Sequence, residues 1–481
     1  MGAETPGIDP ALMARDVASF VIDSREIQAG DVFFALSQPE YTNNGFNGDF
    51  ADATVYVKSW LEKGAVAAVV RRDRFEEHRA ELESFEDRLI FVDDSIVALQ
   101  RLAHHVYLDW NKPVVAITGS AGKTTAKELT AHVLEASGRK VLKNIKNYNN
   151  GLGHPLTVLN LAKDPSYDIA VLEMGMSTPL NEIARLCKIT PPDVSVVLNV
   201  LPVHVEHLGS IENIADAKAE IVEGMKEGGV AVLNADDLRV AAMASLTKGR
   251  VVTYGIENEA DVRASSIAFA GFGLTTFTLT APDGSAEVSF PLNGRHNILN
   301  ALAAAAVGHG LGLTASQIGE SLRTATPPPQ RGEVIHFSKG FTVINDSYNS
   351  NPAALLSMVD TLVEGSEGAK RRIVVAGEML ELGDDAERLH VEMGENIASR
   401  NVDALIGVRG LGQHLVEGAK KAGLANATFA ADSDTAGEML ASDIREGDVV
   451  LVKGSRGVRT EKVIEKLLEK FEAEKSAAVQ R

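Results

Sequence analysis

The stretch VVAITGSAGKTT, residues 114–125, joins an apolar β-branched run to a glycine-rich turn and then to Lys-Thr-Thr. This order predicts a buried strand, a phosphate-binding loop and a helix. Glycines let backbone N–H groups face a phosphate, and the N-terminus of the following helix adds positive potential. The loop is a short variant, because Ile117 stands where the general pattern has a glycine. The flanking strand and helix favour this interpretation over a glycine turn that precedes a lysine by chance.

The residues of this loop are the first candidate site. Lys123 can reach the β and γ phosphates of a nucleotide, and the Thr124 hydroxyl can ligate Mg²⁺. We expect nucleotide contacts from Gly119, Ser120, Ala121, Gly122, Lys123, Thr124 and Thr125.

Composition limits the possible functions. The 481 residues predict two to four domains. A net charge of −19 argues against general nucleic-acid or anionic-membrane binding, although it leaves room for a local basic phosphate pocket. Cys187 is the single cysteine, which excludes a disulfide framework and a cysteine metal site. Neither an N-terminal signal nor a run of 18 apolar residues is visible, so we expect a cytoplasmic protein with no membrane insertion.

The pattern divides into three α/β domains. Residues 1–108 hold short apolar runs and a final helical pattern, which predicts a small α/β N-terminal domain. Residues 109–325 alternate strands and helices, which predicts a central parallel sheet with helices on both faces and ligands at the carboxyl ends of its strands. Residues 262–291 predict an antiparallel hairpin, and 298–311 an alanine-rich helix.

A proline-rich linker, residues 326–330, opens the third domain. Strands are expected at 341–344, 372–376, 404–408 and 449–452, with helices between them. Residues 326–481 therefore predict a Rossmann-like α/β domain that ends in a charged helix over 461–481.

Two carboxyl ends of central strands carry candidate metal ligands. Glu173 ends an apolar strand, where a carboxylate can complete a Mg²⁺ shell; a solvated strand end is the alternative. His204, with Glu206, follows the next strand and is placed for a second metal, directly or through water.

Other central and N-terminal candidates have structural alternatives. Lys218 lies in a helical pattern whose spacing alone predicts a solvated lysine. Asn297 and Asn300 open the alanine-rich helix, and their amides suit the edge of adenine, although Asn297 could instead cap the helix. Ser24 and Arg25 could hold an anionic ligand, or form a turn with a solvated arginine.

The third domain carries its own candidates near two strand ends. Asp346 could accept from ribose hydroxyls, Arg331 could contact the nucleotide, and the segment after residue 452 could bind a carboxylate. The substrate candidates here are Tyr348, Asn349, Lys453, Ser455 and Arg456.

Taken together, these residues resemble the Mur ligase family, the ATP-dependent amide-bond ligases of peptidoglycan precursor synthesis. Residues 118–125 look like the family's phosphate loop, and 173–175 with 199–204 look like its metal region. Residues 294–300 resemble its adenine segment, and 346–352 its third-domain nucleotide contact.

Four stretches resemble the members that add D-alanyl-D-alanine to UDP-N-acetylmuramoyl-tripeptide. They are NNGLGHPLT at 149–157, GEMLELG at 377–383, Leu389-His390 with Gly394, and VKGSRG at 452–457. The resemblance implies substrate contacts from Asn149 and Asn150. It also implies that the first domain binds the UDP-linked substrate, and that the third binds the incoming D-Ala-D-Ala and contacts ATP. Residues 44–50 depart from the family's usual loop, so the nucleotide-sugar assignment rests on Ser24 and Arg25.

The resemblance also implies a mechanism. ATP phosphorylates the tripeptide carboxylate, and the amine of D-Ala-D-Ala attacks the resulting acyl phosphate. Lys218 is expected to be carbamylated by CO₂ and to help place one of two Mg²⁺ ions, whose ligands are Thr124, Glu173, Lys218 and His204. The catalytic residues expected are Lys123, Lys218, His204 and Glu173. The protein is expected to be a monomer.

The sequence disfavours two rival functions. Another amide ligase of this fold, such as a folylpolyglutamate synthase, is disfavoured by the 377–383 and 453–457 stretches. A nucleotide switch protein would need a guanine-reading Asn-Lys-x-Asp, and the Asn-Lys of this chain, Asn111-Lys112, precedes the loop. The sequence does not distinguish lysine from diaminopimelate as the third residue of the tripeptide.

Overall fold

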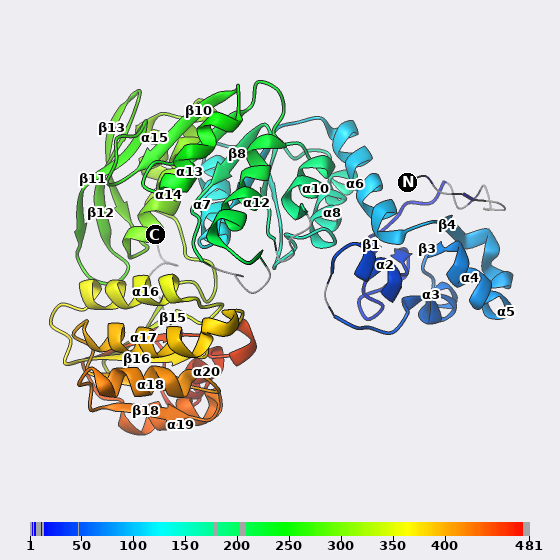
Figure 1. Cartoon of the computed structure of the whole chain (residues 1–481). Helices are drawn as coiled ribbons and strands as arrows, with labels where there is room; N and C mark the ends of the chain where they lie inside the picture. Colours follow the sequence, from blue (N-terminus) through cyan, green and yellow to red (C-terminus); the bar gives the residue numbers. More distant parts are fainter. Residues whose placement is uncertain are drawn as a thin grey trace. The chain divides into compact units, whose positions relative to one another are not determined.

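The computed structural model describes residues 2, 4–5, 11, 14–46, 48–176, 181–202 and 208–474. The chain forms two compact units, which are described separately. The first comprises Met1–Ala116, Arg139–Ser195 and Glu220–Gly229, and the second comprises Ile117–Gly138, Val196–Ala219 and Val230–Arg481. The described strands form sheets of four, nine and six strands (Figure 1).

The four-stranded sheet has the order β1-β2-β3-β4, and all its neighbours are parallel. Its strands are β1 (Phe20–Val21), β2 (Val32–Phe34), β3 (Ala67–Arg71) and β4 (Leu89–Val92). The helices before β4 are α2 (Gln38–Asn43), α3 (Val57–Glu62), α4 (Arg72–Glu77) and α5 (Arg79–Leu82). Helix α6 (Ser95–Trp110) follows; Asp94 caps its start, and Asn111, with φ 45°, follows its last residue.

The nine-stranded sheet has the order β13-β12-β11-β10-β9-β8-β5-β7-β6. Its first six strands along the chain are β5 (Val114–Thr118), β6 (Val141–Lys143), β7 (Ile169–Glu173), β8 (Val194–Val197), β9 (Val230–Asn234) and β10 (Arg250–Gly255). All six lie within residues 109–325, where the sequence predicts alternating strands and helices. Every residue of β5, β7 and β8 is buried, as strands covered on both faces require.

Helices connect these strands in the α/β manner that the sequence predicts. They are α7 (Lys123–Ala136), α8 (Gly153–Val158), α9 (Asn160–Lys163), α10 (Glu182–Ile189), α12 (Ile211–Glu223), α13 (Leu238–Ala242), α14 (Arg295–Gly310) and α15 (Ala315–Leu322). The alanine-rich helix α14 therefore starts three residues before its predicted start.

Three antiparallel strands, and not a single hairpin, occupy residues 262–290. They are β11 (Val262–Phe269), β12 (Thr275–Ala281) and β13 (Gly284–Phe290). Strands β12 and β13 form a hairpin whose last pair is Ala281 with Gly284. The prediction missed one strand because the β11–β12 register is irregular between Ser265 and Ala268, which breaks the alternation of side chains.

The six-stranded sheet has the order β14-β15-β19-β16-β17-β18. Its strands are β14 (Glu333–Phe337), β15 (Phe341–Asp346), β16 (Arg371–Gly377), β17 (Ala404–Val408), β18 (Ala427–Ala430) and β19 (Asp448–Lys453). Its helices are α16 (Pro352–Gly365), α17 (Ala386–Ala398), α18 (Gly412–Lys421), α19 (Ser433–Asp443) and α20 (Glu461–Lys470). The two edge strands, β14 and β18, were not predicted, because neither is a continuous apolar run.

The predicted charged helix over 461–481 is wrong for residues 471–474, because α20 ends at Lys470. The chain then returns to the sheet and pairs with β14. The N–H of Ser338 donates to the oxygen of Glu472 at 2.9 Å, and the N–H of Glu474 donates to that of His336 at 2.8 Å. The ring of Phe471 also packs edge-on against Phe341, and this apolar contact favours the extended return over a longer helix.

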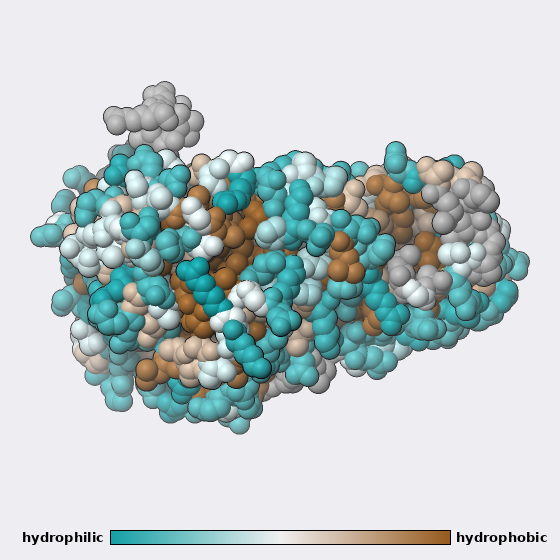
Figure 2. Space-filling model, turned by 90° about the horizontal axis from the view of Figure 1, so that it is seen from above, coloured by the Kyte–Doolittle hydropathy of each residue, from teal (hydrophilic) through white to brown (hydrophobic). Residues whose placement is uncertain are grey.

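One face of the molecule is mainly polar (Figure 2). On the face drawn in Figure 2, hydrophilic residues predominate and hydrophobic residues gather in a few places. Within the described ranges, no helix has both the length and the apolar composition needed to cross a bilayer.

Candidate active site

The phosphate loop connects the buried strand β5 to α7. Gly122, at the N-cap of α7, has φ 82°, a conformation that favours glycine. A Cβ atom at Gly122 would lie 2.5 Å from Oδ1 of Asn300, and one at Gly119 would lie 2.8 Å from Cβ of Leu198. Gly119 is therefore required by the neighbouring Leu198, and Gly122 by its backbone conformation.

A segment after β8 supports the loop from one side. The N–H of Ser120 donates to the backbone oxygen of Asn199 at 3.1 Å, and the N–H of Ala121 donates to Oδ1 of Asn199 at 2.9 Å. Nδ2 of Asn199 donates to the oxygen of Ala121 at 3.1 Å, and the N–H of Leu201 donates to Oγ of Ser120 at 2.9 Å. These bonds fix the backbone of the loop. The ammonium of Lys123 donates to the oxygen of Gly119 at 2.8 Å, across the same turn.

Glu173 is a buried carboxylate, with 4% of its surface exposed, so the alternative of a solvated strand end is wrong. Nδ2 of Asn149 donates to Oε1 of Glu173 at 2.7 Å. The N–H of Glu173 donates to Oδ1 of Asn144 at 2.6 Å, which fixes the end of β7. Carboxylate oxygens held in this way suit a hard cation such as Mg²⁺.

Asn150 acts locally in this structure. Its Oδ1 accepts hydrogen bonds from the N–H groups of Leu152 at 3.2 Å and Gly153 at 2.9 Å. The side chain thus shapes the turn that leads into α8. His204 and Glu206, the candidates for a second metal, lie outside the described residues.

Lys218 is buried in α12, with 2% of its surface exposed, so the solvated lysine that spacing alone suggested is wrong. Burial, and then the charge of Lys123, lower the pKa of its ammonium well below the ordinary value. Within the described part of the chain, its Nζ makes no hydrogen bond or ion pair. A signal was present in the sequence: Lys218 is four residues after Ile214 and three before Ile221, and both isoleucines are fully buried.

Asn297 and Asn300 are buried at the start of α14. The N-cap is Gly294, so Asn297 is not the capping residue; its Nδ2 donates to the oxygen of Asn293 at 2.8 Å. Nδ2 of Asn300 donates to Oδ1 of Asn297 at 3.3 Å. Asn300 also lies against Gly122, so α14 presents an amide to the phosphate loop.

The third-domain candidates gather where the adjacent parallel strands β15 and β19 end. Asp346 and Lys453 are paired in register and form an ion pair. The side chains are 14% and 4% exposed, respectively. Nζ of Lys453 also donates to the oxygen of Asn349 at 2.9 Å, so one lysine holds both sides of the 346–349 turn.

An aromatic ring with two neighbouring cations lies in the same group. Cζ of Arg331 is 4.0 Å from the ring centroid of Tyr348, and Cζ of Arg456 is 5.6 Å from it. Ser455 is buried; its Oγ accepts from the N–H of Leu380 at 3.0 Å and donates to the oxygen of Ser350 at 3.3 Å. The structure therefore brings together all seven third-domain candidates of the sequence.

His390 supports this group and was not predicted as a site residue. Its Nε2 accepts from the N–H of Met379 at 2.9 Å, and its Nδ1 lies 2.6 Å from the oxygen of Ala386. Burial lowers the pKa of this imidazole, which favours the neutral tautomer that these two bonds need. His390 thereby holds the 377–383 stretch, whose Leu380 bonds to Ser455.

Ser24 and Arg25 lie in a turn, in which Ser24 is partly buried and Arg25 is exposed. Nε of Arg25 donates to Oδ1 of Asp23 at 2.9 Å, and the Arg25 side chain is 86% exposed. Hydrogen bonding to Arg25 lowers the pKa of the Asp23 carboxyl. This geometry is that of a turn with a solvated arginine, and it leaves the guanidinium accessible.

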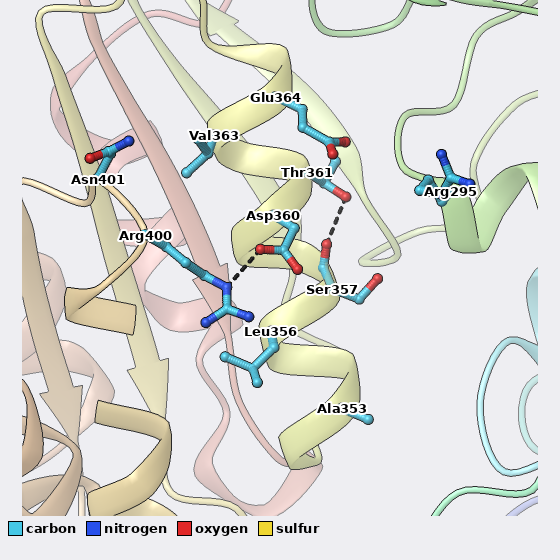
Figure 3. A pocket seen from close by; sticks show the side chains of 10 residues that line it. All are labelled: Arg295, Ala353, Leu356, Ser357, Asp360, Thr361, Val363, Glu364, Arg400 and Asn401. Atoms are coloured by element: carbon cyan, nitrogen blue, oxygen red, sulfur yellow. Dashed lines mark hydrogen bonds and ion pairs between the residues drawn. The ribbon is translucent and has the colours of Figure 1, made fainter. Parts of the chain in front are cut away.

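A surface pocket of about 480 Å³ lies along α16, and Arg295 at the start of α14 also lines it (Figure 3). Its polar groups largely satisfy one another: Nε of Arg400 bonds Oδ1 of Asp360 at 2.7 Å, and Oγ1 of Thr361 donates to the oxygen of Ser357 at 2.8 Å. It contains none of the predicted site residues, and we do not assign it to the reaction.

The buried strand, the glycine-rich loop and the helix that follows define a nucleotide-binding protein of the α/β phosphate-loop class. Two family models match the chain: the Mur ligase middle domain over residues 117–308, and the Mur ligase, glutamate ligase domain over residues 330–456.

Curated relatives extend these matches over most of the chain. It is 33% identical to the UDP-N-acetylmuramoyl-tripeptide--D-alanyl-D-alanine ligase of Bacillus subtilis, over 90% of this chain and 96% of the relative. It is 35% identical to the ligase of the same name from Escherichia coli, over 93% of both chains. A crystal structure of MurF ligase from Thermotoga maritima in complex with ADP is similar, with a TM-score of 0.81, 29% identity and coverage of 96% and 99%. The chain belongs to the Mur ligase family.

Proposed function

We propose that this chain is the ATP-dependent ligase that joins D-alanyl-D-alanine to UDP-N-acetylmuramoyl-tripeptide, giving the pentapeptide precursor of peptidoglycan. The observation that carries the proposal is the similarity to the Bacillus subtilis and Escherichia coli ligases of that name over at least 90% of the chain. The geometry supports the proposal through two features: the glycine-rich phosphate loop and the group of charged side chains in the third domain.

The reaction has two steps. The terminal carboxylate of the tripeptide attacks the γ-phosphorus of ATP, ADP leaves, and an acyl phosphate forms. The amine of D-Ala-D-Ala then attacks the acyl carbon, and phosphate leaves as the amide bond forms. The protein must hold anions together against their repulsion, and the ammonium of Lys123 and the amides of the phosphate loop serve this purpose.

Mg²⁺ would screen the phosphate charge during this transfer. We retain the Mg²⁺ ligands implied by the family: Thr124, Glu173, His204 and Lys218. The buried, hydrogen-bonded carboxylate of Glu173 suits that role. Arg331, Asp346, Asn297 and Asn300 are proposed to contact the nucleotide.

Lys218 is proposed to act as a carbamate. A neutral amine attacks CO₂, loses a proton and becomes an anion that can ligate Mg²⁺. The burial that lowers the pKa of Lys218 favours the neutral amine, and the neighbouring charge of Lys123 would stabilise the carbamate anion.

The remaining assignments concern the domains. We propose that residues 1–108 bind the UDP-linked substrate through Ser24 and Arg25, and that residues 109–325 bind ATP. Residues 326–481 would bind D-Ala-D-Ala and contact ATP. The substrate contacts proposed elsewhere are Asn149, Asn150, Tyr348, Asn349, Lys453, Ser455 and Arg456. We propose a monomer located in the cytoplasm.

The test is phosphate release from ATP and Mg²⁺ with each substrate omitted in turn. Release that requires both UDP-N-acetylmuramoyl-tripeptide and D-Ala-D-Ala, with a pentapeptide product identified by mass, is the expected result. Release that needs a different amine would overturn the substrate assignment. Running the assay with lysine and diaminopimelate tripeptides would define the preferred third residue.

A further inference from the structure

The turn at the end of β9, residues 234–237 with the sequence NADD, contacts the segment that supports the phosphate loop. Nδ2 of Asn234 donates to the oxygen of Leu198 at 2.8 Å. Oδ2 of Asp237 accepts from the N–H of Val200 at 2.7 Å. The hydroxyl of the fully buried Tyr254 donates to the oxygen of Val197 at 3.3 Å. Three backbone groups in the stretch 197–200 are therefore held from one side.

Val200 lies between the two residues that bind the phosphate loop. Asn199 bonds Ser120 and Ala121, and Leu201 exchanges hydrogen bonds with the hydroxyl of Ser120. A shift of the Val200 peptide would therefore move both supports of the loop together. The described structure gives the N–H of Val200 one hydrogen-bond partner, the carboxylate of Asp237.

We propose that Asp237 is a positioning residue for nucleotide binding, acting through Val200, Asn199 and Leu201 on the phosphate loop. Since no contact in this relay involves the reacting atoms, Asp237 is not a catalytic residue. The effect on the KM for ATP rests on the proposed ligase function, whereas the effect on nucleotide binding is measured without either ligase substrate.

The two oxygens of Asp237 have separate tasks, which makes the proposal testable with a small change. Oδ1 caps α13 by accepting from the N–H groups of Arg239 at 3.0 Å and Val240 at 3.2 Å. Oδ2 receives the N–H of Val200. In Asp237→Asn one oxygen remains for the helix cap, where asparagine is as good as aspartate. The amide NH₂ would then face the N–H of Val200, so a donor meets a donor and the bond is lost.

The experiment is titration calorimetry of Mg-ADP with the full chain, followed by steady-state kinetics. We expect Asp237→Asn to raise the Kd for Mg-ADP and the KM for ATP about tenfold, the size of one lost buried hydrogen bond. The KM for the UDP-linked substrate should stay within about twofold, since that substrate does not depend on this relay. A general loss of structure would raise both KM values together, so their difference separates positioning from stability.

Asp432→Asn is the matched control. Asp432 also caps a helix, α19, by accepting from the N–H of Thr435 at 2.8 Å, but it has no bond to the phosphate-loop supports. Its Kd for Mg-ADP should equal that of the unaltered chain. If Asp237→Asn does not fold, Asp237→Ser can be used instead, because serine keeps one capping oxygen and lacks the second oxygen that accepts from Val200. A folded variant that binds Mg-ADP within twofold of the unaltered chain would overturn the proposal.

Discussion

Nδ2 of Asn149 lies 2.7 Å from Oε1 of Glu173, so an amide from the NNGLGHPLT stretch orients the buried carboxylate at the end of β7. The backbone tightens this link, because the N–H of Gly175 donates to the oxygen of Asn149 at 2.8 Å. The stretch that resembles a substrate signature in the sequence therefore also acts on the proposed metal ligand.

Asn149→Ala should raise the Mg²⁺ concentration needed for half-maximal phosphate release by about tenfold, because outer partners of metal ligands typically contribute that much to affinity. Glu173→Gln should lower the rate of phosphate release even at saturating Mg²⁺. Asn160→Ala serves as a control, since Nδ2 of Asn160 bonds the oxygens of Leu156 and Thr157. An unchanged Mg²⁺ requirement in Asn149→Ala would contradict the assignment.

Lys218→Met should separate activity from stability. Burial lowers the pKa of Lys218 in the folded chain relative to the unfolded chain. At any pH below the unfolded pKa, the unfolded chain therefore binds the proton more strongly, and the buried amine lowers the free energy of unfolding. That cost disappears as the pH rises above the unfolded pKa. The methionine variant should therefore unfold at a higher urea concentration at pH 7, in bicarbonate-free buffer, while losing at least about 100-fold in turnover. Full turnover would exclude the carbamate.

The ion pair between Lys453 and Asp346 should matter for folding as well as for binding. Lys453→Ala would leave the largely buried carboxylate of Asp346 without its partner, at a cost of about 3 kcal/mol in the free energy of unfolding. Lys462→Ala is the matched control: its pair with Asp434 is 30% and 46% exposed, and its loss should cost less than about 1 kcal/mol. Urea denaturation measures both, and equal effects would refute the distinction.

His154 should make stability depend on pH. Burial lowers its pKa to about 3, and its Nε2 bonds Oγ1 of Thr190 at 2.7 Å. Between this value and the unfolded pKa of 6.5, the unfolded chain binds a proton that the folded chain does not, so stability falls as the pH falls. His154→Gln should flatten the plot of unfolding free energy against pH from 4 to 6 by about 1.4 kcal/mol per pH unit. Parallel plots for the two proteins would show that His154 does not titrate in this way.

The central strands could be predicted because parallel strands buried on both faces are continuous apolar runs, as in β5 and β8. Edge strands carry a weaker signal. In β18, Thr428 and Phe429 are exposed, and in β14 His336 is exposed, so neither strand stands out from a loop in the sequence.

The candidate site could be predicted where one short motif carries the chemistry, as in the phosphate loop. It could not be predicted where the chemistry depends on contacts between distant segments. The bond from Val200 to Asp237 joins residues 37 positions apart, and the bond from Leu380 to Ser455 joins residues 75 positions apart. The burial of Lys218 could be predicted in part. The helical spacing from Ile214 places it on the apolar side of the helix, but a lysine is not expected there.

The return of residues 472–474 to β14 has a consequence for association between molecules. β14 is an edge strand, and an open edge offers unpaired N–H and C=O groups to a strand from another chain. Glu472 and Glu474 occupy those groups at Ser338 and His336, and their carboxylates add negative charge along the same border. These few residues therefore protect this end of the edge, at His336 and Ser338, from pairing with a strand of another molecule.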